Sequence, residues 1–174
     1  MSTPVDFIGT LFLPELNDNN EYEYTGKTFA NTNSLEERKK IKITTLLCQL
    51  IILALVIYSG FPPFEALSGT YYVILPYLFE VIFLLMQFPS LYTIFTKTKL
   101  REYEYTKSVS RLRPFYFVVG LNAAIGMAGT LVYCFMHGFQ PLSLSLPYLL
   151  CKFMTAALCL YLFWFLQRLK YEEE

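Results

Sequence analysis

Two ionisable side chains, Glu80 and Lys152, lie within long apolar stretches of the sequence. A charge near the centre of a membrane helix costs roughly 3 kcal/mol on insertion scales, so such residues mark a structural or functional site. Counted from the nearer ends of their stretches at about 1.5 Å of helix rise per residue, both lie about 10 to 14 Å deep. Because their depths match and their charges are opposite, we expect them to form an ion pair.

A second set of polar residues lies further along the same stretches, toward the basic segments of the chain. Gln49, Gln87 and Asn122 are each roughly 12 Å from the basic ends of their stretches. Gln87 follows Glu80 by seven residues, which places both on one face of a helix. Amides at this depth hydrogen-bond across membrane helices for about 0.6 to 2 kcal/mol each, so we expect an interior polar layer.

Three roles are open for the ion pair and the polar layer. They can fix the register and partners of the helices, as single interior polar residues do. They can form a substrate or proton pathway, or they can dock another membrane subunit. The fixing of helix register is the interpretation that we favour, because the sequence offers one candidate ion pair and no further set of facing ionisable groups.

The composition defines the elements that must position these residues. The 174-residue chain is 55% hydrophobic and 16% charged, and its charges are confined to blocks between apolar runs. A membrane helix needs about 20 apolar residues to cross a hydrocarbon core about 30 Å thick. Four runs qualify, and we predict an all-α membrane protein with four transmembrane helices at residues 41–58, 71–95, 115–136 and 146–166.

Small residues on the third run indicate close helix packing there. Side chains spaced four apart share a helix face, and small-xxx-small faces let backbones approach. We therefore predict that the third helix is the most central. Two such faces are present, one formed by Gly120, Ala124 and Ala128, the other by Asn122, Gly126 and Thr130.

The basic residues predict the orientation, because Lys and Arg near span ends stay on the cytoplasmic side. They cluster before the first run, between the second and third, and after the fourth, whereas residues 59–70 and 137–145 contain none. Both termini are thus predicted to be cytoplasmic. The resulting segments are an N-terminal segment 1–40, a first transmembrane hairpin 41–95, a basic loop 96–114, a second hairpin 115–168 and a tail 169–174.

The N-terminal segment is polar and ends in a helix start signal. Ser34 with Glu37 matches a capping box, so we expect the first helix to begin near Ser34. Residues 5–13 form an apolar patch that can lie on the membrane surface or pack under the bundle; the alternative is a loosely held terminal segment.

The basic loop is a candidate for lipid headgroup binding, since each Lys or Arg near an anionic surface contributes about 1 kcal/mol. The alternative is that its charges only set the orientation. Tyr92, Tyr103, Tyr105 and Tyr116 suit an interfacial aromatic belt. The six candidate headgroup contacts are Lys97, Lys99, Arg101, Lys107, Arg111 and Arg113.

Three short matches suggest an internal repeat. EYEYT occurs at 21–25 and 102–106, GFxP at 60–63 and 138–141, and LPYL at 75–78 and 146–149, in the same order in each half. A parallel duplication of a helical hairpin explains this, with a pseudo-twofold axis along the membrane normal. Chance matches in an aromatic-rich sequence are the alternative. The alternation of Glu and Tyr also allows each EYEYT copy to be extended.

No chemistry-specific motif emerges. Cys48, Cys134, Cys151 and Cys159 lie in apolar runs without metal-ligand spacing, and the single histidine, His137, has no histidine partner. We expect no metal, no cofactor and no enzymatic activity. With a net charge of zero we also expect no nucleic acid partner.

These observations lead to two hypotheses for function. The first is a non-enzymatic multi-pass protein that acts by contact, as an accessory, assembly or inhibitory subunit of another membrane component. The alternative is a small transporter or channel, dimeric, with Glu80 and Lys152 at its site. The partners expected are the lipid bilayer and either another membrane protein or a second copy. Interior thiols and outer loops without a glycosylation sequon favour a bacterial cell membrane over an ER membrane.

Overall fold

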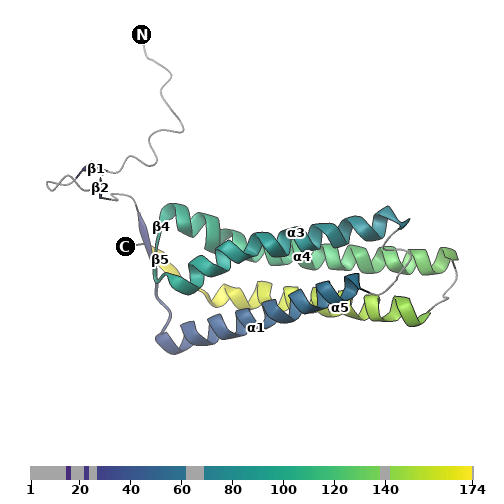
Figure 1. Ribbon diagram of the computed structural model, residues 1–174. Coiled ribbons are helices and arrows are strands. Elements are labelled where there is room, and N and C mark those ends of the chain that lie inside the picture. Colours follow the sequence, from purple (N-terminus) through teal and green to yellow (C-terminus); the bar gives the residue numbers. More distant parts are fainter. Residues whose placement is uncertain (1–14, 17–21, 24–26, 62–68, 138–141, 174) are drawn as a thin grey trace, which may run out of the picture.

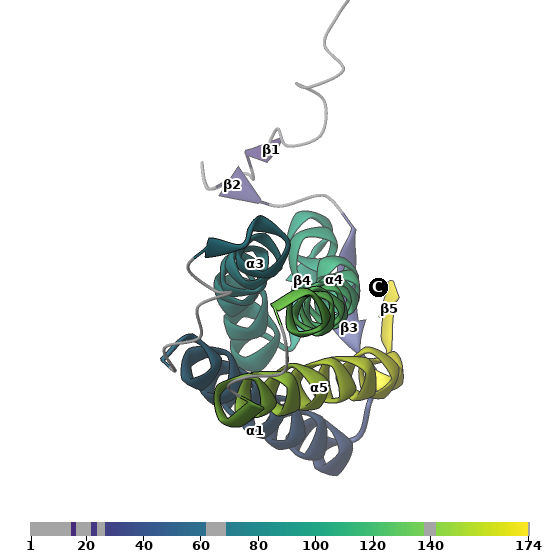
Figure 2. The same ribbon diagram turned by 90° about the vertical axis from the view of Figure 1, so that its right-hand side faces the viewer.

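The computed structural model describes residues 15–16, 22–23, 27–61, 69–137 and 142–173, and four long helices dominate it (Figure 1). Seen along the bundle, α3 and α4 lie side by side, and so do α1 and α5 (Figure 2). All four are long and apolar enough to cross a membrane, which confirms the prediction of four such helices. Their bounds are α1 (Leu35–Gly60), α3 (Tyr71–Thr96), α4 (Glu102–His137) and α5 (Leu142–Phe165).

The first helix begins where the sequence predicts. Ser34 caps α1: its hydroxyl accepts a hydrogen bond from the Glu37 backbone N–H at 3.2 Å, and the Glu37 carboxylate accepts one from the Ser34 backbone N–H at 3.4 Å. This reciprocal arrangement satisfies two donors that every helix start leaves open. The predicted capping box is confirmed.

A small sheet, which sequence reasoning did not find, closes one end of the bundle. The strand β3 (Thr28–Asn31) lies between β4 (Lys99–Arg101) and β5 (Tyr171–Glu173), and both pairings are antiparallel. The N-terminal, middle and C-terminal segments therefore meet at the same end. We call this the sheet end, and the opposite end, where α1 leads to α3 and α4 leads to α5, the loop end.

Asn33 fastens this sheet end. Its side-chain Nδ2 donates to the Arg168 carbonyl at 2.9 Å, and its Oδ1 accepts from the Lys170 backbone N–H at 2.9 Å. Arg168 ends the short helix η1 (Leu166–Arg168) that follows α5. One asparagine thus joins the start of α1 to the end of α5.

The segment predicted as a loop at 96–114 is largely helical. Only β4 and its flanks are extended, and α4 starts at Glu102, well before its apolar part. Acidic residues in the first turn favour this start, because they complement the positive end of the helix dipole. An ion pair between Glu104 and Lys97 holds the turn against the preceding segment.

The extended conformation that the sequence allows for the EYEYT stretches is not adopted at 102–106, so the EYEYT match no longer supports a duplication. The copy at 102–106 is the first part of α4. Of the other copy only two residues are described, and they form β2 (Tyr22–Glu23), paired with β1 (Glu15–Leu16). The apolar patch at 5–13 and most of both GFxP turns lie outside the described residues, whereas both LPYL stretches are helical.

The helices do not pack as two equivalent hairpins. α4 packs along α5, whereas α1 makes few contacts with α3 and packs mainly on α5. α4 and α5 each contact two helices extensively, so α4 is not the only central helix. The buried stripe of α4 passes through Tyr116, Val119, Ala123 and Gly126, which leaves Ala124 half-buried and Ala128 exposed. The predicted packing face of Gly120, Ala124 and Ala128, which are spaced four residues apart, is therefore not buried as a unit.

Candidate functional site

The structure brings Glu80 and Lys152 together inside the bundle. The Lys152 ammonium forms a salt bridge with Glu80 Oε2, and the two side chains are 0% and 1% exposed. Glu80 belongs to α3 and Lys152 to α5, two helices that otherwise contact each other little. The charge pair therefore joins the two halves of the bundle across its interior.

Aromatic rings surround the lysine. Its Nζ lies 4.8 Å from the ring centroid of Tyr77 and 5.1 Å from that of Tyr148, so both rings contribute cation–π attraction. Gly126 of α4 lies beside this arrangement: a Cβ there would be in ordinary van der Waals contact with the Tyr148 hydroxyl at 3.6 Å and with Lys152 Cε at 3.9 Å. A larger side chain at Gly126 would push directly against the pair.

A second polar level lies closer to the sheet end. The Tyr116 hydroxyl donates to Gln49 Oε1 at 2.8 Å, and both side chains are buried. Gln87 lies at a similar depth. Tyr77 of α3 contacts Gly60 of α1, and Gln87 and Gln49 are each about 15 Å along their own helices from this contact. Gln49 and Gln87 thus occupy the predicted layer.

Asn122 does not join this layer, and Tyr116 takes its place. The Asn122 side chain is half-buried and donates to the Val118 carbonyl of its own helix at 2.8 Å. Tyr116, which we expected in an interfacial belt, is fully buried. The signal for it was its position in the stripe of residues three or four apart that includes Val119 and Ala123, since residues so spaced share a helix face.

Several buried polar atoms have no hydrogen-bond partner among the described residues. Gln87 is the extreme case, because neither its Oε1 nor its Nε2 is bonded. In an apolar surrounding each such group costs several kcal/mol, so these positions favour ordered water or a polar ligand. The other unpartnered atoms along the interior are Glu80 Oε1, Gln49 Nε2, Thr45 Oγ1 and Thr155 Oγ1.

The predicted headgroup residues separate into two groups. Lys97 pairs with Glu104, Lys107 donates to the Tyr103 hydroxyl at 2.7 Å, and the exposed Lys99 and Arg101 belong to β4. Arg111 is exposed on α4. Arg113 differs from these, because it lines a pocket between α4 and the end of α5.

The remaining candidates show no assembled reactive centre in the part of the chain described. The four cysteines are buried free thiols, and the ring of His137 stacks on Tyr133 at 4.3 Å between centroids. No group of three His, Cys, Asp or Glu within the described ranges is placed to share a metal ion. Comparison with models of known protein families, with curated proteins and with solved structures found no match to this chain.

Proposed function

We propose that this chain is a non-enzymatic membrane protein that acts by contact, as an accessory or assembly subunit whose α1/α3 face receives a transmembrane helix of a partner protein. The observation that carries the proposal is an apolar groove of about 300 Å³ between α1 and α3. Of the helix pairs that pack side by side in the described chain, α1 with α3, α3 with α4, α4 with α5 and α1 with α5, the pair α1 and α3 makes the fewest contacts. The groove is a gap in an otherwise closely packed bundle.

The lining of the groove suits a helix. Leu85 and Ile57 flank it and are 57% and 49% exposed, so a partner can reach their side chains from the membrane. Membrane helices associate through close packing and interhelical hydrogen bonds, which a concave apolar face with one tyrosine provides. The described residues that line the groove carry no charge; they are Leu53, Val56, Ile57, Gly60, Phe61, Tyr77, Val81, Leu84 and Leu85.

The ion pair links this groove to the interior. Tyr77 lines the groove, and its ring also contacts the Lys152 ammonium. In this proposal Glu80 and Lys152 hold α3 against α5 and so fix the wall of the groove. Their charges neutralise each other within one chain and leave the pair a structural role.

Groove-filling substitution tests the proposal. Leu85→Trp should abolish co-purification of a stoichiometric partner from the native membrane in mild detergent, with the loss measured by mass spectrometry. Ile125→Trp is the matched control, because Ile125 is an exposed residue of α4 that does not line the groove. A partner retained equally by both variants, or a wild-type protein purified with no partner, would count against it.

A small transporter or channel is the second candidate, favoured by the unpartnered polar atoms along the interior. In this case Glu80 carries the transported proton or contacts the solute. Reconstituted vesicles distinguish the two candidates: a folded Glu80→Gln protein that loses solute or proton flux supports transport. If vesicles that contain the wild-type protein show the same flux as empty vesicles, transport is excluded.

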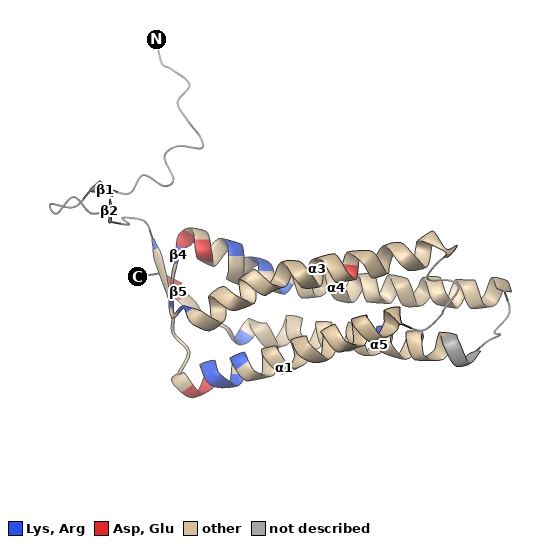
Figure 3. Ribbon diagram, in the orientation of Figure 1, with Lys and Arg blue, Asp and Glu red and all other residues tan. Residues whose placement is uncertain are grey.

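For orientation we propose that the sheet end faces the cytoplasm. Apart from the interior Lys152, the described Lys and Arg residues gather at this end and in the adjoining turns of the helices (Figure 3), which is where the positive-inside tendency places them. The buried free thiols suit a bacterial cell membrane. For a hairpin duplication, the LPYL match is the remaining support, because both stretches are helical, whereas the two hairpins pack differently.

A further inference from the structure

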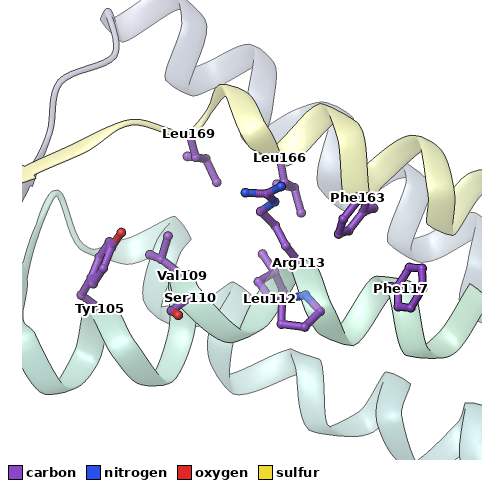
Figure 4. A pocket seen from close by; sticks show the side chains of 10 residues that line it. Tyr105, Val109, Ser110, Leu112, Arg113, Phe117, Phe163, Leu166 and Leu169 are labelled. Atoms are coloured by element: carbon purple, nitrogen blue, oxygen red, sulfur yellow. The ribbon is translucent and has the colours of Figure 1, made fainter.

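The strongest unexplained feature is the pocket of about 450 Å³ between α4 and the end of α5, near the sheet end. Its residues change in character along its length (Figure 4). Tyr105 and Ser110 are at the side of the sheet, Arg113 is in the middle, and the rings of Phe117 and Phe163 are on the membrane side. The pocket is thus polar at one end and aromatic at the other.

Arg113 is the one charged residue in the lining. Its side chain extends from α4 toward Leu166 and Leu169 (Figure 4). It lies over the Phe163 ring, with 5.3 Å from the guanidinium carbon to the ring centroid. The structure gives it no hydrogen bond or ion pair with any described residue, and its Nε is a buried donor without a partner. A guanidinium has five N–H donors, so the donors of Arg113 are available to bind an anion.

We propose that this pocket binds one anionic phospholipid, with the phosphate on Arg113 and the start of an acyl chain against Phe117 and Phe163. An arginine fork matches phosphate geometry in a bidentate manner, which a lysine does not. Among the described residues, no Asp or Glu lines the pocket to compete for the guanidinium. The proposal is independent of the contact function of the α1/α3 groove.

The position in the bundle favours a lipid over a soluble phosphate compound. Arg113 directly precedes the apolar part of α4, so its head lies at the depth of lipid phosphates. The aromatic wall continues from there into the membrane-spanning part. Lys107 and Arg111 are exposed on the preceding turns of α4, and they favour a headgroup with net negative charge over a zwitterionic one.

Tyr105 holds the sheet side of this pocket in place. Its ring stacks on Phe29 of β3 with 4.3 Å between centroids and meets Tyr171 of β5 edge-on at 5.7 Å. The sheet thereby fixes one wall of the lipid pocket. A preformed wall reduces the ordering cost of binding, as preorganisation does in general.

A binding titration with matched variants tests this. Purified protein in a neutral detergent is titrated with phosphatidylglycerol or with phosphatidylcholine, and binding is followed by native mass spectrometry. Arg113→Gln should weaken phosphatidylglycerol binding about tenfold or more. Arg111→Gln removes the same charge two residues away, outside the pocket, and should leave binding within about twofold.

Three results would overturn the proposal. One is equal weakening by Arg113→Gln and Arg111→Gln, which indicates diffuse attraction to the surface. Another is displacement of the lipid by millimolar inorganic phosphate, which assigns the site to a soluble phosphate compound. If Arg113→Gln does not fold, the wild-type protein decides: its melting temperature must rise more with phosphatidylglycerol than with phosphatidylcholine, and an equal rise contradicts the proposal.

Discussion

Two cations of the described chain, the buried Lys152 and the half-buried Arg113, occupy opposite situations. Lys152, deep in the bundle, has a carboxylate and two aromatic rings as neighbours, so its charge is neutralised within the chain. Arg113, near the sheet end, has one aromatic ring and no carboxylate partner among the described residues. A charged side chain in the hydrocarbon core needs a partner within the protein, whereas one at the membrane interface can bind a lipid headgroup instead. In our proposals, depth in the membrane thus separates a structural cation, Lys152, from a lipid-binding cation, Arg113.

Among the substitutions that test this comparison, Lys152→Met should change the stability of the protein most. It leaves Glu80 buried without its partner, so the free energy of unfolding should fall by about 3 to 5 kcal/mol. The measurement is unfolding by SDS from mixed micelles, followed by circular dichroism. Lys107→Met, at an exposed position on α4, serves as the control and should change the value little.

The double variant Glu80→Gln/Lys152→Met then sharpens the comparison. Since it removes both charges, it should recover most of the lost stability. A double variant as unstable as Lys152→Met alone would mean that the two side chains do not act as a pair.

Asn33→Ala tests whether the sheet end is held by specific bonds. The change removes the two 2.9 Å hydrogen bonds to the segment after α5, and each is worth about 1 kcal/mol. We expect a loss of about 2 kcal/mol and faster hydrogen exchange of the β3 and β5 amides, read by mass spectrometry. Thr32→Ala, at an exposed neighbouring position, is the control; unchanged exchange in Asn33→Ala contradicts the assignment.

Tyr116→Phe addresses the inner polar level. It removes the donor to Gln49 Oε1 and leaves the glutamine side chain without a partner among the described residues. The expected loss is about 1 kcal/mol, the usual size for a side-chain hydrogen bond between membrane helices. Tyr92→Phe, on an exposed face of α3, should have no effect in the same SDS titration. Equal values for the two variants would show that the buried bond adds no stability.

Lys27→Ala gives the smallest effect. Lys27, directly before β3, forms a salt bridge of 2.8 Å with Glu173 of β5, and the hydrogen bond to Glu173 raises the pKa of Lys27. Both side chains are largely exposed, so water screens the pair and the thermal midpoint should not move measurably. A loss equal to that of Asn33→Ala would show that charge, rather than Asn33, holds the sheet.

The four helices could be predicted because apolar length alone determines them, and the start of α1 because its capping box is local in sequence. The sheet could not, since its strands are only three or four residues long and pair over more than sixty residues of chain. Depth along the sequence correctly placed Glu80 opposite Lys152. It did not distinguish Asn122 from Tyr116, because depth leaves the rotation of a helix open.

The sheet also limits the directions in which the four helices can run across a membrane. Two long helices separate β3 from β4, and two more separate β4 from β5. The three strands can therefore meet only if each intervening pair of helices returns to its starting side. A chain in which one helix fails to insert leaves a strand on the wrong side of the bilayer, where it has no neighbour to pair with. Pairing of β3 with both β4 and β5 therefore requires that α1 with α3, and α4 with α5, each leave from and return to the sheet end.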